Sequence, residues 1–115
     1  MTQPQSPFDA IYNVQRWGDG YFRIGKDGHL HVRPQGDQGG EATLEAVLQA
    51  CRAAGLRTPV LARFSGILRD RVRRLAGAFR GAIGEQAYQG RYTPVYPIKV
   101  NQQRRVVHEI LRARE

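Results

Sequence analysis

The sequence predicts an α/β protein, in which a β-hairpin segment and linker at residues 1–40 precede two βα units at residues 41–115. Three observations support this fold class. Two short alternating runs flank an Asp-Gly pair, which is typical of a β-hairpin. Apolar residues then recur with the period of amphipathic helices. Short apolar runs separate these helices, and the order strand, helix, strand implies parallel strands with a right-handed connection.

The predicted hairpin joins residues 21–24 to residues 30–33. The five residues between them contain Asp27-Gly28, so Lys26 is expected in the turn. Residues 34–40 include three glycines and one proline, and this composition predicts a loop that ends the segment.

Three amphipathic helices follow. Their apolar stripes are Leu44, Val47, Leu48 and Cys51 in the first, Leu68, Val72, Leu75, Phe79 and Ile83 in the second, and Val106, Val107, Ile110 and Leu111 in the third. Thr43, Ser65 and Asn101 are the expected N-terminal caps. Gly55 is placed to end the first helix, and the second is expected to end near Gln89-Gly90.

Residues 59–64 and 92–100 are the predicted parallel strands. Parallel sheets are covered on both faces and contain more than two strands, so two strands alone would leave apolar edges open. We therefore expect the chain to be the N-terminal piece of a longer α/β protein.

Composition narrows the function classes. The apolar share of 41% and the single cysteine fit a folded protein of a reducing compartment, and the first residues lack the apolar stretch of a secretory signal, so we expect a cytoplasmic protein. The net charge of +8 is uneven, because residues 52–115 contain fourteen Lys and Arg against four Asp and Glu. Only Lys26 and Lys99 are lysines, so each lysine requires a local explanation.

Lys99 is the strongest candidate for chemistry. It lies at the C-terminal end of the second predicted strand, in the most apolar stretch of the chain. The catalytic rim of an α/β barrel is built from such strand ends. Burial there would favour the neutral amine, a nucleophile that the permanently protonated guanidinium of arginine cannot replace. The alternative is a lysine that reaches solvent from a strand end.

Other candidates have plainer explanations. His29 and His31 resemble a metal pair on one strand face, but no third ligand lies near, so we expect no metal site in this chain. Ser65 lacks the frame of a hydrolase nucleophile, and Cys51 fits a packed helix position. Arginines 71, 73 and 74 could bind phosphate or form a solvated helix face.

Three segments resemble the bacterial biosynthetic arginine decarboxylases. These are YNVQRWGDGYF at residues 12–22, LARFSGIL at residues 61–68, and GRYTPVYPIKVNQQRRVV at residues 90–107. Gly66 departs from the acidic residue common at this place in the family, which affects the start of a helix rather than the resemblance.

The resemblance implies an alanine-racemase-like (β/α)8 barrel, of which this chain would hold the first two βα units, followed by a β domain. It implies pyridoxal 5'-phosphate and magnesium as cofactors, and conversion of L-arginine to agmatine and carbon dioxide in putrescine and spermidine biosynthesis. Lys99 would be both the catalytic residue and the residue that binds the cofactor. The rest of the active site would lie beyond Glu115, so the fragment alone would be inactive.

We further expect a homo-oligomeric parent enzyme with neither nucleic acid nor membrane as partner, since no apolar run approaches the roughly 20 residues of a membrane-spanning helix. One alternative is a related barrel decarboxylase that acts on diaminopimelate, ornithine or carboxynorspermidine. The other is a small basic nucleic-acid-binding module, which would be expected to interleave aromatic residues with its cations. The second helix carries Phe79 on its apolar face and Tyr88 only at its end, which disfavours the binding module.

Overall fold

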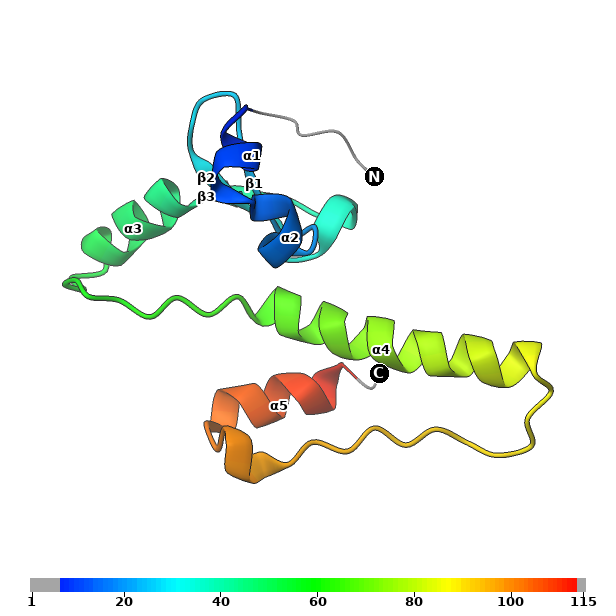
Figure 1. Ribbon diagram of the computed structural model, residues 1–115. Coiled ribbons are helices and arrows are strands. Elements are labelled where there is room, and N and C mark those ends of the chain that lie inside the picture. Colours follow the sequence, from blue (N-terminus) through cyan, green and yellow to red (C-terminus); the bar gives the residue numbers. More distant parts are fainter. Residues whose placement is uncertain (1–6, 114–115) are drawn as a thin grey trace. The chain divides into compact units, whose positions relative to one another are not determined.

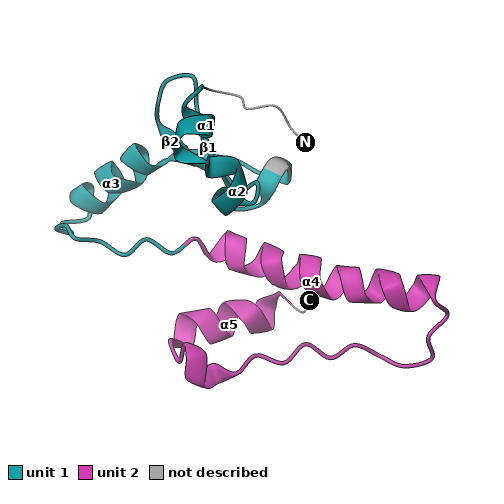
Figure 2. Cartoon of the chain, in the orientation of Figure 1, with its two compact units in different colours: residues 1–63 teal, residues 64–115 magenta. Residues whose placement is uncertain are grey.

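The structure is a computed structural model that describes residues 7–113. The helices and strands in chain order are α1 (Pro7–Tyr12), α2 (Val14–Gly18), β1 (Phe22–Ile24), β2 (Leu30–Val32), the 3₁₀ turn η1 (Gly36–Gln38), β3 (Ala42–Thr43), α3 (Leu44–Ala53), α4 (Ser65–Glu85), the 3₁₀ turn η2 (Ile98–Val100) and α5 (Arg104–Arg112) (Figure 1). They divide into two compact units, residues 1–63 and residues 64–115, here called the N-terminal and C-terminal units (Figure 2).

The N-terminal unit is built on a three-stranded antiparallel sheet in the order β1-β2-β3. The predicted hairpin is confirmed, because Phe22 pairs with Val32 and Ile24 with Leu30. Its turn closes where the Gly28 amide donates to the Gly25 carbonyl at 3.0 Å, and Gly28 takes a φ of 79° that favours glycine.

Two short helices pack beside β1 and complete the core of the N-terminal unit. Asp9 of α1 is only 3% exposed, and its Oδ1 accepts from the Ile24 amide at 3.0 Å. Within residues 7–113 β1 pairs only with β2, so this bond satisfies an amide on the other edge of β1. The most buried apolar residues of the unit are Val14, Tyr21, Ile24 and Val32.

Helix α3 confirms both of its predicted ends. The Thr43 side chain accepts from the Ala46 amide at 3.1 Å, as an N-cap does. At the other end Gly55 takes a φ of 76°, its amide donates to the Arg52 carbonyl, and the Leu56 amide donates to the Cys51 carbonyl. This pair of bonds is a Schellman motif.

The C-terminal unit consists of α4, an extended return segment and α5. The return segment, residues 88–97, runs back along α4, so that α5 points in the same direction as α4 (Figure 1). Ala76 of α4 and Val106 and Ala113 at α5 are buried between the two helices. Phe79 stacks on Tyr92 with ring centroids 4.1 Å apart, which attaches the return segment to α4.

Three expected helix ends in this unit are wrong. Ser65 is the first residue of α4 and not its cap, because the capping position belongs to Phe64. Asn101 likewise lies ahead of the capping position of α5, which is Gln103. Helix α4 ends at Glu85, several residues before the predicted end, because Ala87 turns the chain with a left-handed φ of 48°.

Of the two segments predicted as parallel strands, residues 59–64 and 92–97 are extended but unpaired in the described part of the chain. The predicted strand end at residues 98–100 is wrong, because these residues form the 3₁₀ turn η2, which places Lys99 in a turn. Residues 59–63 belong to the N-terminal unit, residues 64 and 92–97 belong to the C-terminal unit, and neither segment carries a strand pairing. An extended segment becomes a strand only when neighbours satisfy its backbone groups. The barrel and the domain boundary at residue 40 remain predictions. None of the helices within residues 7–113 has the length and apolar character needed to cross a membrane.

Candidate functional site

Lys99 lies in the short 3₁₀ turn η2, between the return segment and α5. The turn is formed where the Val100 amide donates to the Pro97 carbonyl at 3.0 Å and the Asn101 amide donates to the Ile98 carbonyl at 3.1 Å. Proline at position 97 fixes the backbone just before the turn, so the chain bends directly around the lysine.

Side-chain bonds hold this bend from both sides. The Tyr96 hydroxyl donates to the Asn101 carbonyl at 3.1 Å across the turn. The Asn101 Oδ1 then accepts from the Gln103 amide at 3.0 Å, which sets the direction in which α5 begins. The bond between Tyr96 and Asn101 spans the lysine, so it holds the turn without using the lysine side chain.

The Lys99 side chain is exposed and forms neither a hydrogen bond nor an ion pair with any residue within 7–113. The burial expected for Lys99 at a strand end is therefore not found, because the residue lies in an exposed turn. Its primary amine is still the group that a pyridoxal cofactor requires for covalent attachment. Shortly after it, Arg104, Arg105 and His108 line a hollow of about 250 Å³ on α5. Guanidinium groups suit a phosphate group, so the two arginines could contribute to holding one.

The predicted histidine pair is arranged differently from a metal site. His29 precedes β2 and lies 3.3 Å from Glu45, measured from Nδ1 to Oε2. His31, in β2, lies between two carboxylates: its Nε2 is 3.1 Å from Asp27 Oδ2, and its Nδ1 is 3.1 Å from Glu41 Oε1. Within residues 7–113 no group of three or more potential ligands is placed to hold a metal ion.

Arg23 completes the charged group around His31. Its Nε donates to Glu41 Oε2 at 3.0 Å, and its Nη2 also bonds the other carboxylate oxygen. A bidentate contact of this kind fixes the orientation of the carboxylate. The Arg23 guanidinium, with His31 as a smaller contribution, lowers the pKa of Glu41, while the His29 amide and the His31 ring lower the pKa of Asp27.

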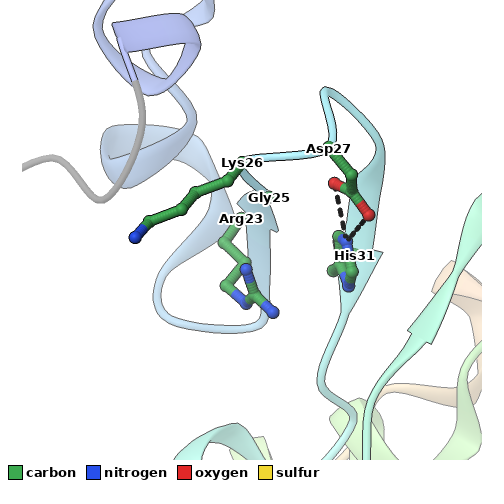
Figure 3. A pocket seen from close by; sticks show the side chains of 5 residues that line it. All are labelled: Arg23, Gly25, Lys26, Asp27 and His31. Atoms are coloured by element: carbon green, nitrogen blue, oxygen red, sulfur yellow. Dashed lines mark hydrogen bonds and ion pairs between the residues drawn. The ribbon is translucent and has the colours of Figure 1, made fainter.

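Gly25 makes the contact between Asp27 and His31 possible. A Cβ on this residue would lie 2.3 Å from Asp27 Oδ1 and 2.7 Å from His31 Nε2, so any side chain would displace the pair. These residues border a hollow of about 570 Å³, and Lys26 points away from the others (Figure 3). No pattern in the sequence indicates this cluster, because only strand pairing brings Glu41 to His31.

The remaining candidates occupy structural positions. Cys51 is a half-buried free thiol on α3, and Ser65 is half-buried in the first turn of α4. The three clustered arginines, at positions 71, 73 and 74, are exposed on α4. Lys99 belongs to the C-terminal unit and the histidine pair to the N-terminal unit, so the units hold the predicted site residues separately.

Comparison with known proteins gives one consistent result. The biosynthetic arginine decarboxylase of Marinobacter nauticus is 47% identical over 109 residues, which is 94% of this chain and 17% of that protein. The chain is similar to biosynthetic arginine decarboxylases. Those of Pseudomonas aeruginosa and Parasynechococcus marenigrum are 48% and 46% identical over 102 residues, which is 89% of this chain and 16% of each enzyme.

The match covers the chain far better than it covers the relatives. The chain spans about a sixth of the length of these curated arginine decarboxylases. No model of a known protein family matches it. The resemblance noted in the sequence is therefore confirmed as a similarity to part of these enzymes.

Proposed function

We propose that this chain is a part of a biosynthetic arginine decarboxylase, an enzyme that converts L-arginine to agmatine and carbon dioxide in polyamine biosynthesis. The observation that carries the proposal is the similarity to enzymes of that name, 46–48% identical across about nine tenths of the chain. The enzyme would use pyridoxal 5'-phosphate and magnesium, and the barrel that holds them would be completed by chain outside these residues.

Lys99 is the proposed catalytic residue. Pyridoxal phosphate, when bound, supplies the electron sink that makes loss of carbon dioxide from an amino acid feasible. The lysine amine would attach the cofactor and exchange with the incoming arginine amine at the same carbon. The backbone turn at residues 97–101 supports this role, because it fixes the position of the lysine while leaving its amine unbonded.

Arg104 and Arg105 have a proposed supporting role. They follow the lysine at the start of α5, where helix amides also favour a negative group. Their guanidinium groups would attract phosphate without undergoing proton transfer, since they remain charged at any physiological pH. The residues that choose between substrates and that contact the pyridine nitrogen would lie outside this chain, so the chain alone should have no decarboxylase activity.

The test is made on the complete enzyme. Release of labelled carbon dioxide from carboxyl-labelled L-arginine, with agmatine identified by mass, would support the proposal. Ornithine and diaminopimelate serve as competing substrates, and a preference for either would replace arginine decarboxylase by a related barrel decarboxylase.

Lys99→Arg tests the lysine within the same enzyme. Borohydride reduction of the unmodified enzyme should link the cofactor to the peptide that contains Lys99, and the variant should lose both this link and turnover. Lys26→Arg makes the same exchange in the exposed hairpin turn and should remain active. Normal turnover in Lys99→Arg would show that another residue holds the cofactor.

A further inference from the structure

We propose that Tyr96 is a positioning residue for Lys99: the bond from its hydroxyl to the Asn101 carbonyl holds the backbone turn that carries the lysine amine. This inference rests on the proposed function of Lys99. It adds to that function a second residue, which acts through the backbone of the turn rather than on the reacting atoms.

The turn around Lys99 has little packing to hold it. Residues 97–100 are all exposed, and even the apolar side chains of Ile98 and Val100 are 53% and 72% exposed. Two backbone bonds of the i to i+3 type close the turn, and both lie within residues 97–101. Bonds of this 3₁₀ type have poorer geometry than those of an α-helix. Within residues 7–113, hydrogen bonds rather than buried apolar contacts therefore define the turn.

Tyr96 adds a side-chain bond from one end of the turn to the other. Its hydroxyl donates to the Asn101 carbonyl at 3.1 Å, and this contact is partly buried. Pro97 restricts the residue before it to extended backbone, so the direction in which the Tyr96 side chain leaves the chain is limited. The tyrosine ring itself has few torsions to fix, so forming this bond costs little conformational entropy.

Asn101 connects the tyrosine bond to helix α5. Its amide donates to the Ile98 carbonyl, its own carbonyl accepts from Tyr96, and its Oδ1 accepts from the amide of Gln103, the capping position of α5. Val106 of α5 is buried against α4. The residue two positions after the lysine is therefore tied to the packed part of the C-terminal unit.

The proposed chemistry depends on where the lysine amine is held. Lysine has a flexible four-carbon side chain, so a mobile backbone would add to the range of positions that the amine visits. Reacting groups must meet in a near-attack geometry, and small misplacements are costly in rate. Loss of one ordinary hydrogen bond changes an equilibrium by about two- to tenfold, which sets the size of the expected effect.

Tyr96→Phe removes the hydroxyl and keeps the ring. In the complete enzyme without cofactor, hydrogen exchange followed by mass spectrometry should show about fivefold faster exchange in a peptide covering residues 97–103. Peptides from α4 serve as the internal reference. Tyr88→Phe is the matched control, because Tyr88 is an exposed tyrosine of the same unit whose hydroxyl bonds no residue within 7–113. Unchanged exchange in Tyr96→Phe, or equal acceleration in both variants, would overturn the proposal.

A second measurement reads the lysine itself. After pyridoxal phosphate is added to the enzyme without cofactor, the link that borohydride can reduce should form about fivefold more slowly in Tyr96→Phe. A general loss of stability would lower the number of sites that load, not the rate at which each folded site forms the link. Turnover per bound cofactor should fall by a similar factor while KM for L-arginine stays the same, because the residues that choose the substrate would lie outside this chain.

The outcomes separate this proposal from the function on which it rests. If borohydride links the cofactor to Lys99 at the same rate in Tyr96→Phe and in the unmodified enzyme, the role of Tyr96 is refuted and that of Lys99 stands. If the cofactor is linked to a different lysine, the assignment of Lys99 fails and the positioning role fails with it.

Discussion

Ala87→Gly should raise the free energy of unfolding of the C-terminal unit by about 0.5–1 kcal/mol. Ala87 has a φ of 48° and occupies the C′ position after α4, where its amide donates to the Gly84 carbonyl and the Tyr88 amide donates to the Ile83 carbonyl. A side chain in this conformation costs about 1–2 kcal/mol. Glycine also loses more conformational entropy on folding than alanine, which reduces the expected stabilisation by about 0.5–1 kcal/mol.

The matched control is the same substitution inside the same helix. Ala78 is exposed in the middle of α4, so Ala78→Gly should lower the free energy of unfolding by about 1 kcal/mol. Urea unfolding followed by far-ultraviolet circular dichroism should separate the two variants, with the Ala87→Gly midpoint about 0.3–0.7 M above that of the unmodified chain. If Ala87→Gly were destabilised like Ala78→Gly, residue 87 would not hold the left-handed turn that ends α4.

Three further predictions concern single features of the chain. Gly25→Ala should break the contact between Asp27 and His31 and lower the melting temperature. Gly40→Ala is the control and should have little effect, because a Cβ there meets no atom within 4 Å. Equal melting temperatures of the two variants would contradict this prediction. The pKa values of Asp27 and Glu41 are lowered in the fold, so their contribution to stability is complete above about pH 5 and is lost as the pH falls through the lowered values. In acid unfolding, Glu41→Gln should therefore lose less stability between about pH 5 and the acid limit than the unmodified chain does. Binding to duplex or single-stranded DNA near physiological salt should be weak and strongly salt-dependent, and submicromolar binding that persists in raised salt would support a nucleic-acid module.

The parts of the fold predicted correctly are those set by short-range chemistry. The Asp27-Gly28 turn, the Thr43 cap and the Gly55 stop each depend on bonds within five residues, and all three are present. A side chain that can satisfy a backbone amide next to it, or a glycine that can take a positive φ, acts in the same way in many folds.

The errors fall where the sequence offers two equivalent choices or depends on distant partners. Ser65 and Asn101 are good capping residues, but Phe64 and Gln103 occupy the capping positions, and the Asn101 side chain bonds the Gln103 amide in a turn instead. Residues 92–100 are apolar like a strand, yet pairing requires neighbours that no local pattern specifies.

The same distinction between local patterns and distant partners applies to the candidate site residues. Lys99 could be singled out from the sequence, because a lysine in an arginine-rich chain and in an apolar stretch is visible without coordinates. The His31 cluster could not, since Arg23, His31 and Glu41 come together only through the register of three strands. The sequence did show His29 and His31 as a pair, but the carboxylates that face them were not apparent.

Trp17 of α2 is the only tryptophan in the chain, and it lies in the N-terminal unit. Its indole Nε1 donates to the Tyr12 carbonyl at 3.0 Å, and its ring lies 5.4 Å from that of Phe22 on β1. Tryptophan fluorescence will therefore respond to changes around α2 and β1, whereas the helical signal of the chain is dominated by α4, the longest helix. Emission and ellipticity thus provide separate optical reporters for the two units, and comparing their transitions measures directly whether the units unfold together.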